Sequence, residues 1–264
     1  LGTDWLGTRL NVPNLSQIIK GSFFKTNENF YYANEMRYPK EGGYKSYLNY
    51  MTNNLKINLN KKAILIDNKN KKIIFEDGKI DIYEKLISTI PLPELIKIIK
   101  DVPSDVKNAS EKLLATSAQL VSIGFNKKIE QPLWYYIYDE DFIPSRAWAP
   151  NLKSQENTPL NKSSVQFESY FSKLKPKKLN RENLIDHIIK KSKTNKLFSE
   201  NDIECIDYRE MKYANIIFDF NRKKNLKVVH DFLDSINIFY CGRFGKWDYL
   251  WSDQCLLNGR SISK

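Results

Sequence analysis

The end of the sequence, from Gly242 to Arg260, combines residues that can hold a planar or anionic ligand. Gly242 and Gly245 follow an expected strand and let the backbone approach a ligand without a Cβ in the way. A helix is expected to begin near Ser252–Asp253, and the free N–H groups and dipole of a helix start stabilise an anion. Tyr249 lies between them, and its phenol can donate to a phosphate oxygen while its ring packs. The segment therefore predicts a site for a planar or phosphorylated ligand.

The charge of the chain narrows the class of ligand. With 42 Lys and Arg against 31 Asp and Glu, the net charge is +11. The lysines are scattered beside Asn and Ile, as in Asn60-Lys61-Lys62, which is typical of a solvated face. No basic helix or RNA-binding signature accompanies them, so we expect no nucleic-acid partner. A basic balance suits a small anionic substrate.

The sequence also bears on metal chemistry and on the cell compartment. Its three cysteines have no metal-ligand spacing and only two histidines are present, so we expect no metal site and a reducing cytoplasm. We expect both histidines, His187 and His230, on the surface. No apolar run approaches the roughly 20 residues that span a bilayer. The start, Leu1–Trp5, has neither a secretory signal nor a Met, which indicates a cut chain or a fragment.

The elements that position these residues alternate between strands and helices. Asn14 is expected to cap the first helix and Gly21 to end it, and Pro91 and Pro93 are expected to stop a strand. The alternation predicts an α/β or mixed α+β fold with two sheets. Periodicity predicts strands at 55–59, 63–67, 72–75, 80–83, 86–90, 117–125, 134–138, 163–170, 208–218 and 236–241, and helices at 14–21, 44–53, 95–99, 109–114, 184–191, 225–235 and 251–263.

The residues after the last expected strand match a known family. The run Gly242-Arg243-Phe244-Gly245-x-Trp247-x-Tyr249, followed by Asp253-Gln254 and Gly259-Arg260, resembles the C-terminal flavin-binding stretch of FAD-dependent UDP-galactopyranose mutases and their amine oxidase and protoporphyrinogen oxidase relatives. In that family the arginine lies against FAD, the tyrosine binds the substrate's phosphate and the helix start cradles the isoalloxazine. The resemblance therefore implies that Tyr249 binds substrate and that FAD is contacted by Gly242, Arg243, Asp253 and Gln254.

Other stretches resemble the family in the same order. Asp4–Leu10 is similar to a segment whose arginine reaches the active site, which implies a substrate-binding role for Arg9. Met36–Gly43 resembles an aromatic turn before a helix, which implies that Gly42 and Gly43 contact the cofactor. Arg146, followed by Glu168, matches a substrate-domain strand whose arginine pairs with the pyrophosphate of a nucleotide sugar. From the residues alone, Arg146 can equally be a surface arginine beside Trp148, and Arg9 a partner in an ordinary ion pair.

Three features depart from the family pattern. The Gly-x-Gly-x-x-Gly loop that holds the FAD pyrophosphate is absent from this sequence. Asn215 stands where the mutases carry another substrate tyrosine, so it becomes a substrate-binding candidate. Tyr44-Lys45 replaces the small residues that follow the glycine pair in the mutases. We interpret Trp247 and Trp251 as packing residues rather than ligand-stacking ones.

The resemblance implies a two-domain flavoprotein of the amine oxidase and glutathione reductase-like type, with an incomplete FAD-binding domain and a substrate domain built on a mixed sheet. We expect a helical, substrate-side segment at residues 1–40. Parts of the FAD-binding domain are expected at 41–95 and 236–264, and the substrate-binding domain at 96–235.

Three functions remain open at this point. The first is a mutase that interconverts the pyranose and furanose forms of a nucleotide sugar through reduced FAD, with a flavin reductant such as NAD(P)H. The second is an FAD-dependent oxidoreductase of the amine oxidase or protoporphyrinogen oxidase type. The third is a truncated, non-catalytic fragment.

Overall fold

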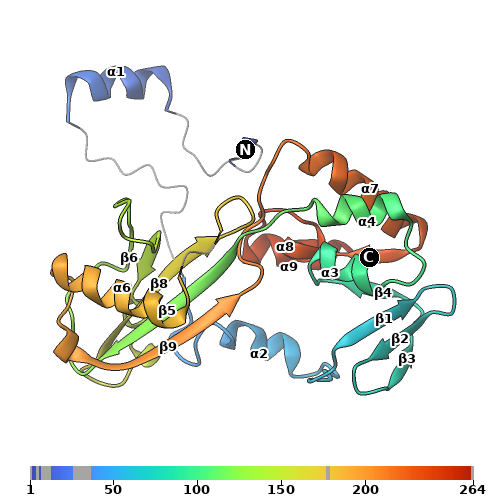
Figure 1. The fold of residues 1–264 in the computed structure, drawn as a ribbon, viewed down its shortest axis with the longest axis horizontal. Coiled ribbons are helices and arrows are strands. Elements are labelled where there is room, and N and C mark those ends of the chain that lie inside the picture. Colours follow the sequence, from blue (N-terminus) through green and yellow to red (C-terminus); the bar gives the residue numbers. More distant parts are fainter. Residues whose placement is uncertain (1, 4–5, 7–12, 26–36, 177–178, 263–264) are drawn as a thin grey trace.

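The computed structural model describes residues 2–3, 6, 13–25, 37–176 and 179–262, which we call the described residues (Figure 1). They form two packed parts, each with its own hydrophobic core, and contain three sheets rather than the two predicted. Along these ranges no helix combines the length and apolarity that a membrane crossing needs.

The first part is a five-stranded antiparallel sheet with the strand order β6-β7-β8-β5-β9. The strands are β5 (Ser117–Phe125), β6 (Trp134–Tyr136), β7 (Arg146–Trp148), β8 (Ser163–Phe171) and β9 (Ile203–Met211). Alternate residues of a strand point to opposite faces, and one face carries Val121, Ile123 and Phe167. Helix α6 (Arg181–Thr194) covers this face with Leu184 and Ile188 and is capped by Asn180, so the opposite face keeps the polar side chains (Figure 1).

The second part packs helices against two smaller sheets. Strands β4 (Leu86–Ser88) and β10 (Ile238–Tyr240) pair in parallel, although most of the chain lies between them. A three-stranded antiparallel sheet holds β1 (Ala63–Asp67), β2 (Lys72–Phe75) and β3 (Ile80–Ile82). The helices are α3 (Leu92–Ile98), α4 (Ser104–Glu111), α7 (Arg222–Ser235), α8 (Gly242–Gly245) and α9 (Ser252–Ile262). Trp247 is fully buried in this core, as predicted.

Short elements connect and flank the two parts. They are α1 (Leu15–Phe23), α2 (Ser46–Thr52), α5 (Pro150–Lys153) and the 3-10 turns η1 (Gln155–Asn157) and η2 (Glu200–Asp202). The division into cofactor and substrate domains stays a prediction, but the cores are clear. Helices α3, α4 and α7 share the core of the parallel strand pair, whereas the chain from β5 to β9 builds the five-stranded sheet.

Several predicted elements differ from the observed ones. Asn14 caps α1 through a capping box, but the helix runs through Gly21 to Phe23. Residues 55–59 alternate like a strand but form none, because no described strand pairs with them and their apolar side chains are exposed. Pro91 and Pro93 open α3 rather than only stopping a strand, because proline suits the first turn of a helix.

Differences also occur in the second half of the chain. The extended stretch predicted at 208–218 is β9, which starts earlier, at Ile203, and ends at Met211. The residues after β10 form the short helix α8 rather than a loop. Strand β7 was not predicted, because three residues between Pro144 and Pro150 are too few to show alternation. Trp251 is exposed, so the packing predicted for it is wrong.

Candidate active site on the polar face of the five-stranded sheet

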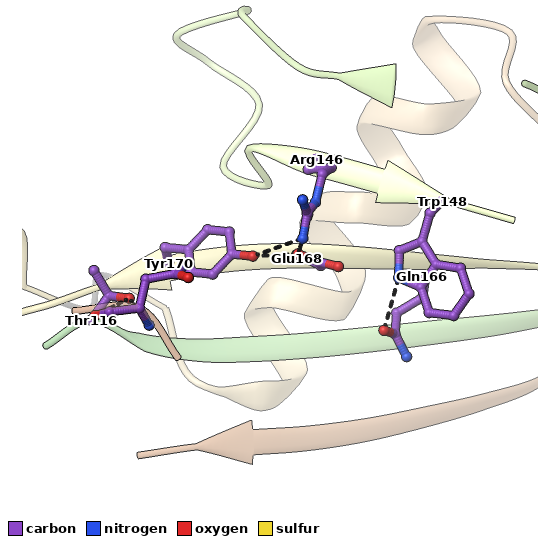
Figure 2. Close-up of polar contacts among 7 residues, drawn as sticks. Thr116, Arg146, Trp148, Gln166, Glu168 and Tyr170 are labelled. Carbon is purple, nitrogen blue, oxygen red and sulfur yellow. Dashed lines mark hydrogen bonds and ion pairs between the residues drawn. The ribbon is translucent and has the colours of Figure 1, made fainter. Parts of the chain in front are cut away.

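The centre of the polar face is a hydrogen-bonded group of three side chains. Arg146 on β7 lies directly opposite Glu168 on β8, and Tyr170 lies two residues further along β8 on the same face. Arg146 Nε lies 3.0 Å and Nη2 2.5 Å from Glu168 Oε2. Arg146 Nη2 also lies 3.3 Å from Tyr170 Oη, and the Tyr170 hydroxyl donates to the same carboxylate oxygen (Figure 2). The group therefore holds the guanidinium in one orientation.

The surroundings fix the protonation of this group. Burial disfavours the charged guanidinium, but the nearby Tyr170 and Glu168 outweigh it and raise the pKa of Arg146. Burial, and then the hydrogen bond to Glu168, raise the pKa of Tyr170 well above its usual range. Arg146 is thus a permanent cation and Tyr170 a permanent hydrogen-bond donor at neutral pH. An anion that reaches this face meets both.

A second polar chain on the same face fixes an aromatic ring. Trp148 Nε1 donates to Gln166 Oε1 at 3.0 Å, and Gln166 Nε2 donates to Ser122 Oγ at 2.8 Å (Figure 2). The ammonium of Lys153, at the end of α5, lies 4.1 Å from the centre of the Trp148 ring. The ring therefore forms a fixed platform beside Arg146.

The C-terminal segment comes to this face through Tyr249. Arg243 donates from Nε and Nη2 to the Leu250 carbonyl oxygen at 2.9 and 2.8 Å, and its guanidinium carbon lies 4.7 Å from the centre of the Tyr249 ring. These contacts hold the loop in front of α9. Tyr249 lies within electrostatic range of the Tyr170 hydroxyl, whose pKa it helps to raise, and its ring packs on the core of the second part. Tyr249 is therefore in the wider neighbourhood of the Arg146 group.

The start of α9 is organised differently from the prediction. Gln254 Oε1 accepts a hydrogen bond from the Trp251 N–H at 2.8 Å, so Gln254 closes the helix start. Asp253 lies in the first turn of α9 and is exposed. Among the described residues no acceptor reaches the N–H groups of Ser252, Asp253 or Gln254. The helix start is therefore open to an anion or to a flavin oxygen.

Two glycine positions leave open backbone surface. Gly242 has φ +75° and Gly43 has φ +64°, and an added Cβ would meet no atom within 4 Å at either one. At Gly42, with φ +76°, an added Cβ would instead lie 3.1 Å from the Ser46 Cβ. The turn is joined to the sheet part because the Ser154 hydroxyl donates to the Lys40 carbonyl oxygen. Gly43 and Gly242 thus expose backbone at two places, one before α2 and one at the start of α8.

Asn215 and Arg9 are the other two predicted substrate-binding residues. Asn215 binds Thr116 through its backbone, with its N–H 3.0 Å from Thr116 Oγ1 and its carbonyl oxygen 2.7 Å from the Thr116 N–H. The backbone of Asn215 thus connects the two parts, and among the described residues no hydrogen bond of its side chain is observed. Arg9 lies outside the described residues.

Both histidines are partly buried, so their predicted surface position is wrong. His187 Nε2 accepts a hydrogen bond from the Ile143 N–H at 3.1 Å. His230 stacks on Tyr240 with 4.1 Å between ring centres, and burial lowers its pKa to about 4. Neither lies on the polar face of the sheet.

The prediction missed Tyr170 and Lys153. Tyr170 was within reach of sequence reasoning, since it follows Glu168 by two residues in a recognised strand. Lys153 gave no such signal, because α5 is a single turn and its approach to Trp148 depends on the fold.

Solved structures with the same architecture support the fold. A reduced UDP-galactopyranose mutase matches with a TM-score of 0.72 and 24% identity, over 80% of this chain and 48% of that chain. A putative protoporphyrinogen oxidase from Exiguobacterium sp. 255-15 matches with a TM-score of 0.64 and 13% identity, over 83% and 50%. A CLA-producing fatty acid isomerase from P. acnes matches with a TM-score of 0.60 and 14% identity, over 81% and 49%.

The chain spans about half the length of each of the three structures. No protein-family model matches the sequence, and no curated protein matches it. The predicted fold class is confirmed: the chain has the mixed α/β fold, with several sheets, of FAD-dependent oxidoreductase-like structures.

Proposed function

We propose that this chain belongs to an FAD-dependent enzyme that interconverts the pyranose and furanose forms of a nucleotide sugar. The observation that carries the proposal is the group of Arg146, Glu168 and Tyr170, with Tyr249 beside it. An oriented guanidinium and two phenols suit the oxygens of a diphosphate. The resemblance of the Gly242–Arg260 segment and the fold likeness to a UDP-galactopyranose mutase agree with it.

In this proposal each residue of the polar face has a binding or orienting task. Arg146 and Tyr249 bind the diphosphate, together with Arg9 from the N-terminal segment. Glu168 holds the Arg146 guanidinium by its Nε and Nη2 atoms, and Tyr170 donates to ligand or to Glu168. Binding of the diphosphate orients the sugar, so that it is held in one pose relative to the cofactor instead of sampling many.

The cofactor side is assigned to the glycine-lined backbone and the start of α9. Reduced FAD, when bound, would supply a nucleophilic nitrogen for the sugar carbon that loses its phosphate. Arg243 holds the loop that carries Tyr249, so it keeps the substrate residue in place next to the cofactor. Gly43 and Gly242 give the cofactor close access, and the N–H groups of Asp253 and Gln254 stabilise negative charge on it.

The experiment uses the whole, flavin-loaded protein. The enzyme is reduced with dithionite, UDP-galactopyranose is added and UDP-galactofuranose is assayed. We expect furanose only from the reduced form. We also expect Arg146→Gln to lower kcat/KM by roughly ten- to a hundredfold, since a charged hydrogen bond contributes about 1.5–3 kcal/mol.

Arg181→Gln is the matched control, because Arg181 lies on α6 on the other face of the sheet, over the Tyr208 ring. Its activity should equal that of the wild type. A yellow protein that forms no furanose but is reduced by an amine or a porphyrinogen would replace the proposal with the oxidase hypothesis. A colourless protein would leave only the non-catalytic scaffold.

A further inference from the structure

Lys153 is a cation on the polar face that pairs with no carboxylate of the described residues. It is the last residue of α5, and its ammonium lies 4.1 Å from the centre of the Trp148 ring and 5.7 Å from that of Tyr38. No carboxylate among the described residues forms an ion pair with it. Most other partly buried lysines of the protein are paired, for example Lys191 with Asp141 and Lys162 with Glu204.

The neighbourhood of Lys153 contains more positive than negative charge. Burial and the nearby Arg146 lower the pKa of Lys153, and Glu168 only partly opposes them. Glu168 Oε2 already accepts hydrogen bonds from Arg146 and from Tyr170. Among the described residues, the two cations Arg146 and Lys153 therefore share the single carboxylate of Glu168, which leaves one positive charge without an acidic counterpart. Partly burying an unpaired cation costs free energy, which a ligand anion can offset.

The position of Lys153 is set by the same platform that borders the site. Trp148 and Arg146 are two residues apart on β7 and point to the same face, and the Trp148 ring is held by Gln166. An ammonium above this ring is attracted by the ring face but keeps its three donors free for oxygen ligands. The side chain is therefore held beside Arg146 rather than extended into solvent.

We propose that Lys153 is a second cation for the phosphates of the substrate, so that Arg146 and Lys153 together bind a diphosphate. This inference rests on the proposed function and narrows its substrate class. A diphosphate carries more charge than Arg146 alone can offset, because Glu168 already balances that guanidinium. The site should therefore select a diphosphate ester over a monophosphate ester or an uncharged nucleoside.

The test measures binding of UDP, UMP and uridine to the whole, flavin-loaded protein by calorimetry, for the wild type and for Lys153→Met. We expect Lys153→Met to weaken UDP binding by about tenfold or more and UMP binding by less, and to leave uridine binding unchanged. It should also reduce the salt dependence of UDP binding, since one charge fewer takes part.

Two further variants serve as controls. Lys190→Met removes the same charge from an exposed position on α6, beyond the other face of the sheet, and should bind UDP like the wild type. Lys153→Arg keeps the charge and should recover most of the lost affinity. A flavin content and circular dichroism spectrum equal to the wild type establish that each variant is folded.

The outcomes separate this inference from the proposed function. If Arg146→Gln loses UDP affinity while Lys153→Met keeps it, Lys153 is not a ligand residue and the proposed function stands. If Lys153→Met loses affinity for uridine as much as for UDP, the effect is on the shape of the site and the inference is wrong. If the wild type binds neither UDP nor UMP, the proposed function fails and the inference fails with it.

Discussion

The carboxylate of Glu168 offers the sharpest test of how the polar face is held together. Glu168→Gln keeps the shape of the side chain but removes its charge. The carboxylate side chain is only 9% exposed, whereas that of Arg146 is 39% exposed. Breaking a fully buried ion pair costs about 3–5 kcal/mol, and losing an exposed one costs about 0–1 kcal/mol. With one partner buried and the other partly solvated, we expect a loss of about 2 kcal/mol in the free energy of unfolding.

The measurement is urea unfolding followed by circular dichroism at neutral pH. With a urea dependence of about 2 kcal/mol per molar, the midpoint should fall by roughly 1 M. Glu204→Gln is the matched control, because Glu204 on β9 pairs with Lys162, the residue before β8, and both side chains are partly exposed, at 45% and 32%. We expect a change below about 1 kcal/mol for it. If the two variants unfold at the same urea concentration, the ion pair does not hold the site as we describe.

Two other substitutions test separate features. Gly242→Ala should destabilise the protein by roughly 1–2 kcal/mol in urea unfolding, because φ +75° is costly for alanine although no atom blocks its Cβ. Gly21→Ala, inside α1, should be neutral or stabilising. Equal effects of the two substitutions would contradict the backbone argument. His230 has its pKa lowered to about 4, mainly by burial, and no described residue forms a hydrogen bond with its buried Nε2. The unfolded state therefore takes up the proton first, so the stability is complete above about pH 6.5 and falls as the pH drops toward 4. His230→Gln should flatten this slope in urea unfolding between pH 7 and 5, and an unchanged slope would exclude His230 as its source.

Long periodic segments were the predictable part of the fold. The bounds of β1, β2 and β5 agree with the alternation of their apolar residues, and Asn14 caps α1 as its side-chain chemistry requires. The strand predicted at 55–59 has the same alternation and still failed, because a strand also needs a neighbour to pair with. The pattern of residues within a segment therefore predicts a strand only where a second strand lies beside it and pairs with it.

The residues of the candidate site could be predicted only where they belong to a recognised motif. Arg146 and Tyr249 were proposed from the resemblance, and the structure places both near Tyr170. Lys153 was missed because its partner ring belongs to another element, and the hydrogen bond between the Trp251 N–H and Gln254 was not predicted. Contacts between elements distant in the sequence depend on register and on packing, which no local pattern contains.

The parallel pairing of β4 with β10 has a consequence for how the chain folds during synthesis. The whole five-stranded sheet lies between these two strands in sequence, so their core cannot close until β10 has been made. The strands from β5 to β9 follow one another in sequence, so their sheet can form before then. We therefore expect the polar face around Arg146 to form before β4 pairs with β10, because long-range pairing is the slow step of folding.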